Sequence, residues 1–252
     1  MISLAKNVAV TSEGIDGIED KLANIARSSY VSPSHVRDAL VAGWERAADA
    51  ALEDNVLSRD EEERLNSFRK HFELAPEDLN VHGGWTRIVM GAALRDLLEG
   101  KIPTRFRTPE HLPFNMHTSE TLVWAFEHVK YYEKRTRTTY VGGSEGMSVR
   151  MMSGVYFRTS SFRGAPVTTP ETVLVDTGMM GITTRNIYFA GERKGFRIPY
   201  AKIVTFGPYS DAIEVVRDAA SAKPQIFLTG EGWFVYNLVR NLATRVEKST
   251  PT

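Results

Sequence analysis

The sequence predicts an α+β protein in which a helical N-terminal half precedes an antiparallel β half that ends in a helix. Up to about residue 100, apolar residues recur at helical spacing behind helix-capping residues. Residues 171–206 form short β-type runs separated by tight polar turns, which leaves no room for crossover helices. From Trp233 to Val246 the spacing is helical again, with an apolar stripe.

Four helices are expected in the first 100 residues. One follows Ser12, and a second begins with Ser32 as N-cap and Pro33 in the first turn. A third begins at Ser58, where Ser-Arg-Asp-Glu is a capping box. The fourth follows Gly83-Gly84 and ends at Gly100. Together they predict a small helical bundle.

The segment from Ala51 to Glu61 resembles the helix-loop-helix of TerB-like and EF-hand-like domains. Aligning Asn55 with the glycine of the calcium loop puts Asp54, Ser58 and Glu61 at the fifth, ninth and twelfth positions. The first and third positions would be Ala50 and Leu52, which offer no side-chain oxygen, whereas calcium needs six to eight oxygen ligands. We therefore expect a degenerate loop that binds no calcium and pairs two helices.

Domain boundaries follow from the proline-bearing segment between the two halves. Gly100–Pro113 holds three prolines and few core-type residues, which is typical of a semi-rigid linker. We predict a helical bundle at 1–100, a linker at 101–112, a β domain with its C-terminal helix at 113–246 and a tail at 247–252.

In the β half, strands are predicted from β-branched and aromatic runs between turn residues. The Thr184-Arg185-Asn186 turn and the glycine-bounded Gly191–Gly195 turn separate three of them. The predicted strands are Thr121–Val129, Lys130–Tyr140, Val149–Phe157, Thr172–Val175, Met180–Thr183, Ile187–Ala190, Phe196–Ile198, Lys202–Phe206 and Gln225–Thr229.

The run ITTRNIYFAG, a basic turn and the run FRIPYAKIVTF resemble the bacterial PH-like and GRAM-like domains. The resemblance covers roughly Pro113–Val246. It implies two antiparallel sheets of seven strands in all, packed as a sandwich or open barrel with a helix closing one end. Domains of this kind bind lipids, bind peptides or serve structural roles, so the resemblance leaves the ligand open.

Composition excludes several classes of protein. The 252 residues include no cysteine, so disulfides and thiolate chemistry are absent. The N-terminal stretch is too short and polar for a signal peptide, and no window has the 18 apolar residues of a membrane span. We expect a cytoplasmic protein, with peripheral attachment to a membrane left open.

Charge is balanced overall, with 31 basic and 31 acidic residues, but it is unevenly distributed. Up to Arg105 there are 13 Lys and Arg against 18 Asp and Glu, a net of −5; the remainder carries 18 against 13, a net of +5. Two mutually attractive domains, a basic surface with an anionic partner, and scatter in composition all fit this pattern.

Catalytic and metal motifs point away from an enzyme. Gly142–Gly146 matches G-x-S-x-G, but that motif needs a following helix and a later histidine, whereas residues 147–151 read as a strand and His128 is the last histidine. His111, His117 and Glu120 lie close in sequence, but the linker context favours solvated side chains. No HExxH, P-loop or dinucleotide-binding motif occurs among the six histidines and the glycines. We predict no cofactor, no metal and no catalytic residue; an unrecognised site in the helical half is a minor alternative.

Basic side chains are the candidate binding residues. Lipid-binding PH domains carry a loose basic pattern near the first hairpin, onto which Lys130, Arg135 and Arg137 can be placed. If the cations converge, they could bind a phosphorylated headgroup; otherwise they protect a solvated edge strand. The candidates are Lys130, Lys134, Arg135, Arg137, Arg193, Lys194 and Arg197.

The function predicted from the sequence is a non-catalytic binding or scaffold module. It would recognise a protein or peptide partner through the PH-like domain, at an exposed strand edge. The alternative is recruitment to anionic lipid through the basic cluster. Nucleic acid is the weaker reading, because the chain is neutral and shows no regular aromatic platform.

Overall fold

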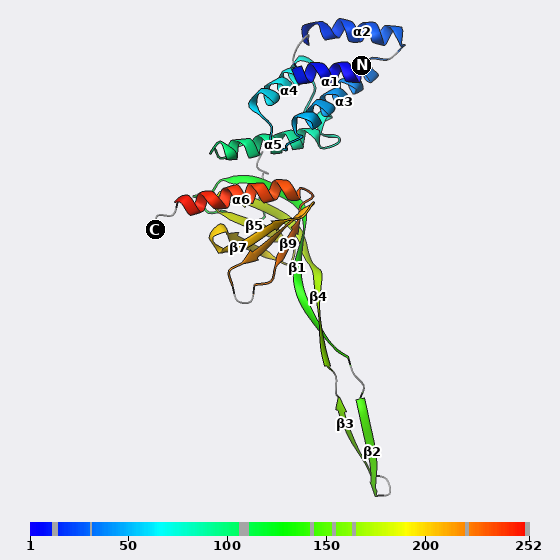
Figure 1. Cartoon of the computed structure of the whole chain (residues 1–252), viewed down its shortest axis with the longest axis vertical. Coiled ribbons are helices and arrows are strands. Elements are labelled where there is room, and N and C mark those ends of the chain that lie inside the picture. The colour runs from blue at the N-terminus through cyan, green and yellow to red at the C-terminus, as the bar shows by residue number, and fades with distance from the viewer. Residues whose placement is uncertain are drawn as a thin grey trace. The chain divides into compact units, whose positions relative to one another are not determined.

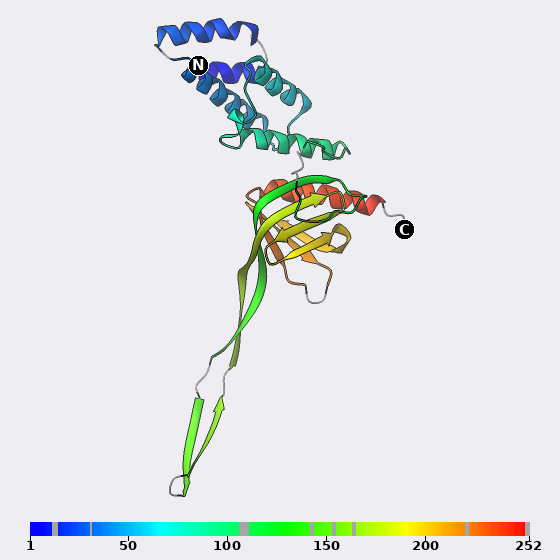
Figure 2. The ribbon, with the colours of Figure 1, turned by 180° about the vertical axis from the view of Figure 1, so that it is seen from behind.

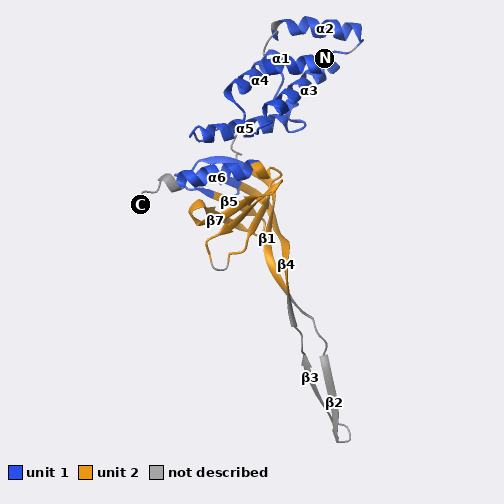
Figure 3. Ribbon diagram, viewed as in Figure 1, with its two compact units in different colours: residues 1–125, 181–186, 234–252 blue, residues 126–180, 187–233 orange. Residues whose placement is uncertain are grey.

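The computed structural model describes residues 1–11, 15–30, 32–105, 111–141, 144–152, 155–162, 165–219 and 222–249. Side chains are described except for residues 16, 138–167 and 247–249. The chain is α+β, as predicted, and divides into two compact units (Figure 3). Unit 1 comprises residues 1–125, 181–186 and 234–252, and unit 2 comprises residues 126–180 and 187–233.

Helices make up the N-terminal part of unit 1 (Figure 1). The prediction missed the first of them, because its ten residues read as a weak apolar stretch; Ala5, Val8 and Ala9 are nevertheless buried. The elements are α1 (Ile2–Thr11), a 3-10 turn (Ile15–Gly17), α2 (Ile18–Ser28), α3 (Pro33–Ala51), α4 (Arg59–His71), a second 3-10 turn (Asp78–Asn80) and α5 (Gly84–Leu98).

The helical core forms around Trp44 of α3, which is fully buried and donates its indole N–H to the carbonyl oxygen of Leu65 at 3.0 Å. A close approach of α1 requires glycine on α3, since a Cβ on Gly43 would lie 2.4 Å from that of Ala5. The predicted cap at Ser58 is confirmed, with both bonds of the capping box present.

The α3–α4 loop has the backbone expected at a glycine position, with Asn55 at φ 63°. Its polar side chains bond within the loop and the following helix. The Asp54 carboxylate accepts the Val56 N–H at 2.9 Å, and the Glu61 carboxylate accepts the N–H and hydroxyl of Ser58 at 2.9 and 2.6 Å. These oxygens therefore stabilise the helix pair.

The beginning of the predicted linker is held by arginines. Arg245 donates to the carbonyl oxygens of Gly100 and Lys101 at 2.6 and 3.1 Å. Arg105 pairs with Glu62 at 2.5 Å and with Asp96 at 2.6 Å. Residues 106–110 lie outside the described part of the chain, and the predicted domain boundaries stay predictions.

A curled antiparallel sheet of seven strands has the order β6-β5-β4-β1-β9-β8-β7 (Figures 1 and 2). A separate antiparallel hairpin pairs β2 with β3. The strands are β1 (Leu122–Val141), β2 (Ser144–Met152), β3 (Val155–Phe162), β4 (Ala165–Thr183), β5 (Asn186–Gly191), β6 (Gly195–Pro199), β7 (Ile203–Pro208), β8 (Ala212–Arg217) and β9 (Gln225–Leu228).

Several predicted strands were divided or placed wrongly. β1 is one strand where two were expected, and β4 joins two predicted strands with the residues between them. The strand predicted at Val149–Phe157 instead spans the end of β2 and the start of β3. β8 was not predicted. The predicted boundaries depended on local residue types, whereas strand limits also depend on long-range pairing.

An aromatic cluster fills the interior face of unit 2. The ring of Tyr131 lies 5.3 Å, centroid to centroid, from the rings of Phe189, Phe196 and Phe227. Along β1, the alternation of buried and exposed side chains shifts by one residue at His128, whose φ of 55° lies in the left-handed region. Glu127 and His128 are consequently both exposed before Val129 and Tyr131 turn inward.

The chain ends in α6 (Gly232–Ser249), which confirms the predicted C-terminal helix. Phe234, Leu238 and Leu242 of the predicted stripe are buried, and Phe234 meets the ring of Trp124 edge to face at 4.9 Å. Among the helices that the structure describes, none is long and apolar enough to cross a bilayer.

Candidate functional site

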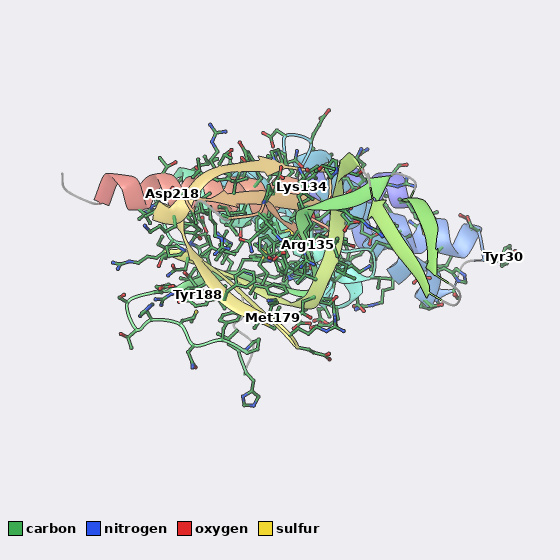
Figure 4. All side chains as sticks on the ribbon, turned by 90° about the horizontal axis from the view of Figure 1, so that it is seen from below. Tyr30, Lys134, Arg135, Met179, Tyr188 and Asp218 are labelled. Carbon is green, nitrogen blue, oxygen red and sulfur yellow. The ribbon has the colours of Figure 1, made fainter. Side chains whose placement is uncertain are left out.

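The basic residues predicted near the first hairpin, Lys130, Lys134, Arg135 and Arg137, all lie within β1. Lys134 and Arg135 are neighbours in an extended strand, so their side chains point to opposite faces (Figure 4). The Lys134 ammonium group lies 2.6 Å from the Glu214 carboxylate and donates to the Tyr209 hydroxyl at 3.2 Å. Lys134 and Arg135 therefore cannot bind the same headgroup from one face of the sheet, and Lys134 already has partners in the fold.

Arg135 belongs to a polar network beside the aromatic cluster. Its guanidinium group lies 3.0 Å from the Glu133 carboxylate, which also accepts the Tyr131 hydroxyl at 2.7 Å. Gln225 in turn donates to the Tyr131 oxygen at 2.8 Å. Burial raises the pKa of Glu133, but the hydrogen bonds from Tyr131 and Arg135 outweigh it, so that this pKa is lowered. Arg135 thus serves as a counter-charge to Glu133.

The second predicted group of cations surrounds the β5–β6 turn. The backbone N–H groups of Arg193 and Lys194 donate to one oxygen of the Asp176 carboxylate at 2.8 and 2.7 Å. Burial raises the pKa of Asp176, but these bonds and one from the N–H of Thr177 lower it on balance. The side chains of Arg193, Lys194 and Arg197 are exposed.

The seven predicted cations do not form one cluster. Strand order places β4 and β5 between β1 and β6, which separates Lys130 and Arg137 from Arg197. Arg193 lines a hollow of 620 Å³ in unit 2, next to Glu127, His128 and Glu192. Asp176 also lines this hollow, but its carboxylate already accepts hydrogen bonds from the backbone N–H groups of the β5–β6 turn.

The sheet edges expected to receive a peptide are β6 and β7. β6 is five residues long and ends at Pro199. In β7 the pairing shifts between Ile203 and Thr205, which leaves Val204 as an extra, exposed residue. Short strands, proline and bulges are the features that discourage strand addition.

The remaining candidate residues have structural contacts or lie outside the described part. The Glu120 carboxylate accepts the Thr183 hydroxyl at 2.6 Å and the Asn186 amide at 2.5 Å, and so holds the β4–β5 turn. Ser144 begins strand β2, where a nucleophile elbow would need a helix; residues 142–143 and the Ser144 side chain lie outside the described part. In the described residues no group of three or more His, Cys, Asp or Glu could hold a metal ion.

An apolar groove in unit 1 differs from all these features. We call it the α2–α3 groove; it has a volume of 610 Å³. Charged residues, Glu19 and Arg27, line it near the two ends of α2. The apolar lining comes from both helices, the end of α4 and the α2–α3 connection: Leu22, Ala23, Ala26, Tyr30, Pro33, Val36, Leu40 and Phe72.

The local sequence explains why the groove stays open. Beyond Leu22, the positions of α2 that line the groove include Ala23 and Ala26, whose short side chains leave space beside α3. Phe72, at the C-cap of α4, packs on Phe68 with ring centroids 4.7 Å apart. This packing fixes Phe72 as one wall of the groove.

Tyr30 stands at the mouth of the groove and is 97% exposed, the most exposed of the large apolar side chains in the described chain. It projects away from the helices in Figure 4. Its φ of 52° is left-handed, a conformation that costs a side-chain-bearing residue roughly 1–2 kcal/mol. The chain therefore retains a large aromatic residue in a strained position where it contributes little to burial.

Charge varies along the groove. The first turn of α2 carries Glu19 and Asp20, and the last turn carries Arg27. The Glu19 carboxylate lies 3.3 Å from Nε2 of His71 on α4 and remains largely exposed. The groove thus has an acidic end and a basic end.

The sequence analysis missed this groove. It predicted a small helical bundle, and helical periodicity cannot show where the space between two helices stays open. One signal was present: Tyr30 follows two serines between two helices, outside either apolar stripe.

No protein-family model matches the chain, and no curated protein matches it at a significant level.

Proposed function

We propose that this protein is a non-catalytic binding protein that receives an apolar segment of a protein partner in the α2–α3 groove. The observation that carries the proposal is the apolar, 610 Å³ groove with the exposed Tyr30 at its mouth. An exposed apolar surface rimmed by polar residues is typical of an interaction site, and exposed tyrosine is enriched at such sites.

The groove fits a helix better than an extended peptide. Its long walls are two helices, and grooves of this kind receive the apolar face of an amphipathic helix through residues spaced i, i+3, i+4 and i+7. An extended peptide instead needs an open sheet edge, and both edges of the sheet carry features that oppose addition.

The sheet and its terminal helix form, in this proposal, a PH-like or GRAM-like scaffold, and the helical bundle a TerB-like one. Seven antiparallel strands followed by a helix support the first assignment, and the Asn55 loop between α3 and α4 supports the second. Recognition moves from the β half, where we first expected it, to the helical half.

The test is a titration of the full chain with a labelled amphipathic helical peptide of about 14 residues, with leucine at the i, i+3, i+4 and i+7 positions. A second peptide carries serine at those four positions. We expect saturable binding of the leucine peptide, and affinity for the serine peptide at least about tenfold weaker, because the apolar contact is lost.

Two variants distinguish binding in the groove from nonspecific hydrophobic binding elsewhere on the protein. Val36→Glu places a charge in the apolar wall and should weaken binding at least about tenfold. Leu98→Glu changes an exposed leucine on α5, outside the groove, and should leave the affinity unchanged. Equal affinity for the two peptides, or equal effects of the two variants, would contradict the proposal.

A further inference from the structure

The charges at the two ends of the groove restrict the helix that it accepts. Building on the proposed function, we infer that the preferred partner is an amphipathic helix lying antiparallel to α2. It carries acidic residues in its first turn and basic residues in its last turn.

The charges that line the groove favour one order of charges on the partner. Glu19 and Arg27 both line the groove, eight positions apart on α2, which corresponds to about 12 Å along the helix. A partner helix of two to three turns spans that distance. Its basic residues must then lie near Glu19 and its acidic residues near Arg27, because the opposite arrangement places like charges together.

The helix dipole selects the direction in which the partner lies. A helix is stabilised by acidic residues in its first turn and basic residues in its last, because of its dipole. Antiparallel to α2, such a helix brings its acidic start to Arg27 and its basic end to Glu19. A parallel helix would need the reverse charge order, against its own dipole. Charge pairing and dipole therefore agree on the antiparallel arrangement only.

The walls are compatible with this orientation. The short side chains of Ala23 and Ala26 leave room on α2 for large partner side chains. Val36 and Phe72 also line the groove. Tyr30 lies just beyond Arg27, beside the place where the first turn of the partner would begin. The ring is therefore available to cover an apolar residue of that turn.

The experiment compares two leucine peptides of identical composition. One has glutamates in its first turn and lysines in its last; the other has these charges exchanged. Fluorescence anisotropy with the full chain should show tighter binding of the acidic-first peptide, by about two- to thirtyfold, the range expected for two exposed ion pairs. The double variant Glu19→Lys, Arg27→Glu should prefer the other peptide.

A matched control exchanges two charges elsewhere on the helices. Glu63→Lys, Lys70→Glu preserves net charge on α4, outside the groove, and should retain the wild-type preference. Equal affinity for both leucine peptides, or a preference for the basic-first peptide, would overturn the inferred orientation and leave the proposed function intact.

Two further outcomes bear on the occupant. If neither leucine peptide binds better than the serine peptide, the proposed function fails and the inference with it. If sedimentation shows a peptide-free dimer that Val36→Glu dissociates, the groove belongs to a second copy of the chain, and the partner-helix inference is overturned.

Discussion

The helical part of unit 1 and the sheet of unit 2 use their conspicuous residues in opposite ways. In the sheet, Lys134, Arg135 and Asp176 have partners in the fold: Glu214, Glu133 and the N–H groups of the β5–β6 turn. In the helices, an apolar groove and a strained, exposed Tyr30 remain open to solvent. A charge pattern that suggests a site can serve stability, while the proposed binding surface is apolar.

From this contrast we expect variants of the sheet and variants of the groove to behave differently. Changes in the sheet should alter the free energy of unfolding and leave peptide affinity unchanged. Changes in the groove should alter peptide affinity with little loss of stability. Each prediction below tests one side of that division.

The largest effect is expected in the aromatic cluster. Phe227 is fully buried and contacts Tyr131 and Phe189, so Phe227→Ala should reduce the free energy of unfolding by about 3–5 kcal/mol. Chemical denaturation measures this loss. Peptide affinity, measured where circular dichroism shows the variant folded, should match the wild type; a tenfold loss would break the division between the two regions.

Asp176→Ala should come next, since it removes a charged acceptor from three backbone N–H groups. The pKa of Asp176 is lowered in the folded protein, so its stabilisation is present above the ordinary aspartate pKa and is lost as pH falls through the folded value. Thermal unfolding from pH 7 to pH 2 should therefore show a deficit that shrinks in acid. A deficit independent of pH would exclude this role for the carboxylate.

Ser58→Ala removes the N-cap of α4 and should cost about 0.5–2 kcal/mol. Phe72, which lines the groove, lies at the opposite end of α4 from Ser58. Peptide affinity should therefore stay near the wild-type value. Denaturation and peptide titration of the same preparation check both parts. A stability unchanged from wild type would show that the cap is not formed in solution.

Tyr30→Gly should separate stability from binding most clearly. Glycine adopts the left-handed backbone without the penalty of a side chain, so the variant should be more stable by about 1 kcal/mol. It should nevertheless bind the leucine peptide more weakly, because the exposed ring is lost. Tighter or unchanged binding would mean that Tyr30 is not part of the site.

The smallest effect is expected at Lys134. Its ion pair with Glu214 is partly exposed, so Lys134→Ala should change stability by less than about 1 kcal/mol. Sedimentation with anionic vesicles, at low and high salt, tests the lipid alternative with the same variant. We expect no salt-sensitive pelleting of either protein; pelleting that the variant loses would establish lipid recruitment through β1.

Local signals in the sequence were sufficient for the helix caps and several turns. The capping box at Ser58 and the glycine-like position of Asn55 depend on a few adjacent residues, and both are found in the structure. The C-terminal helix was predicted from its apolar stripe, and the α+β class from the change in periodicity.

Long-range pairing could not be predicted in the same way. Glu214 pairs with Lys134, and Asp176 accepts hydrogen bonds from the β5–β6 turn, although each pair of partners lies far apart in the sequence. These contacts therefore depend on the strand order, which local patterns do not give. The opposite directions of Lys134 and Arg135 did follow from strand alternation, but only once β1 was known to be one strand. The groove depends on how far α2 stands from α3, which no periodicity records.

Hydrogen exchange of the full chain, with and without saturating leucine peptide, locates the surface that the partner helix covers. The peptide should slow exchange in α2 and the first turns of α3, and leave β1, β9 and the β5–β6 turn unchanged. Protection confined to the sheet, with α2 exchanging as in the free protein, would contradict the proposed function.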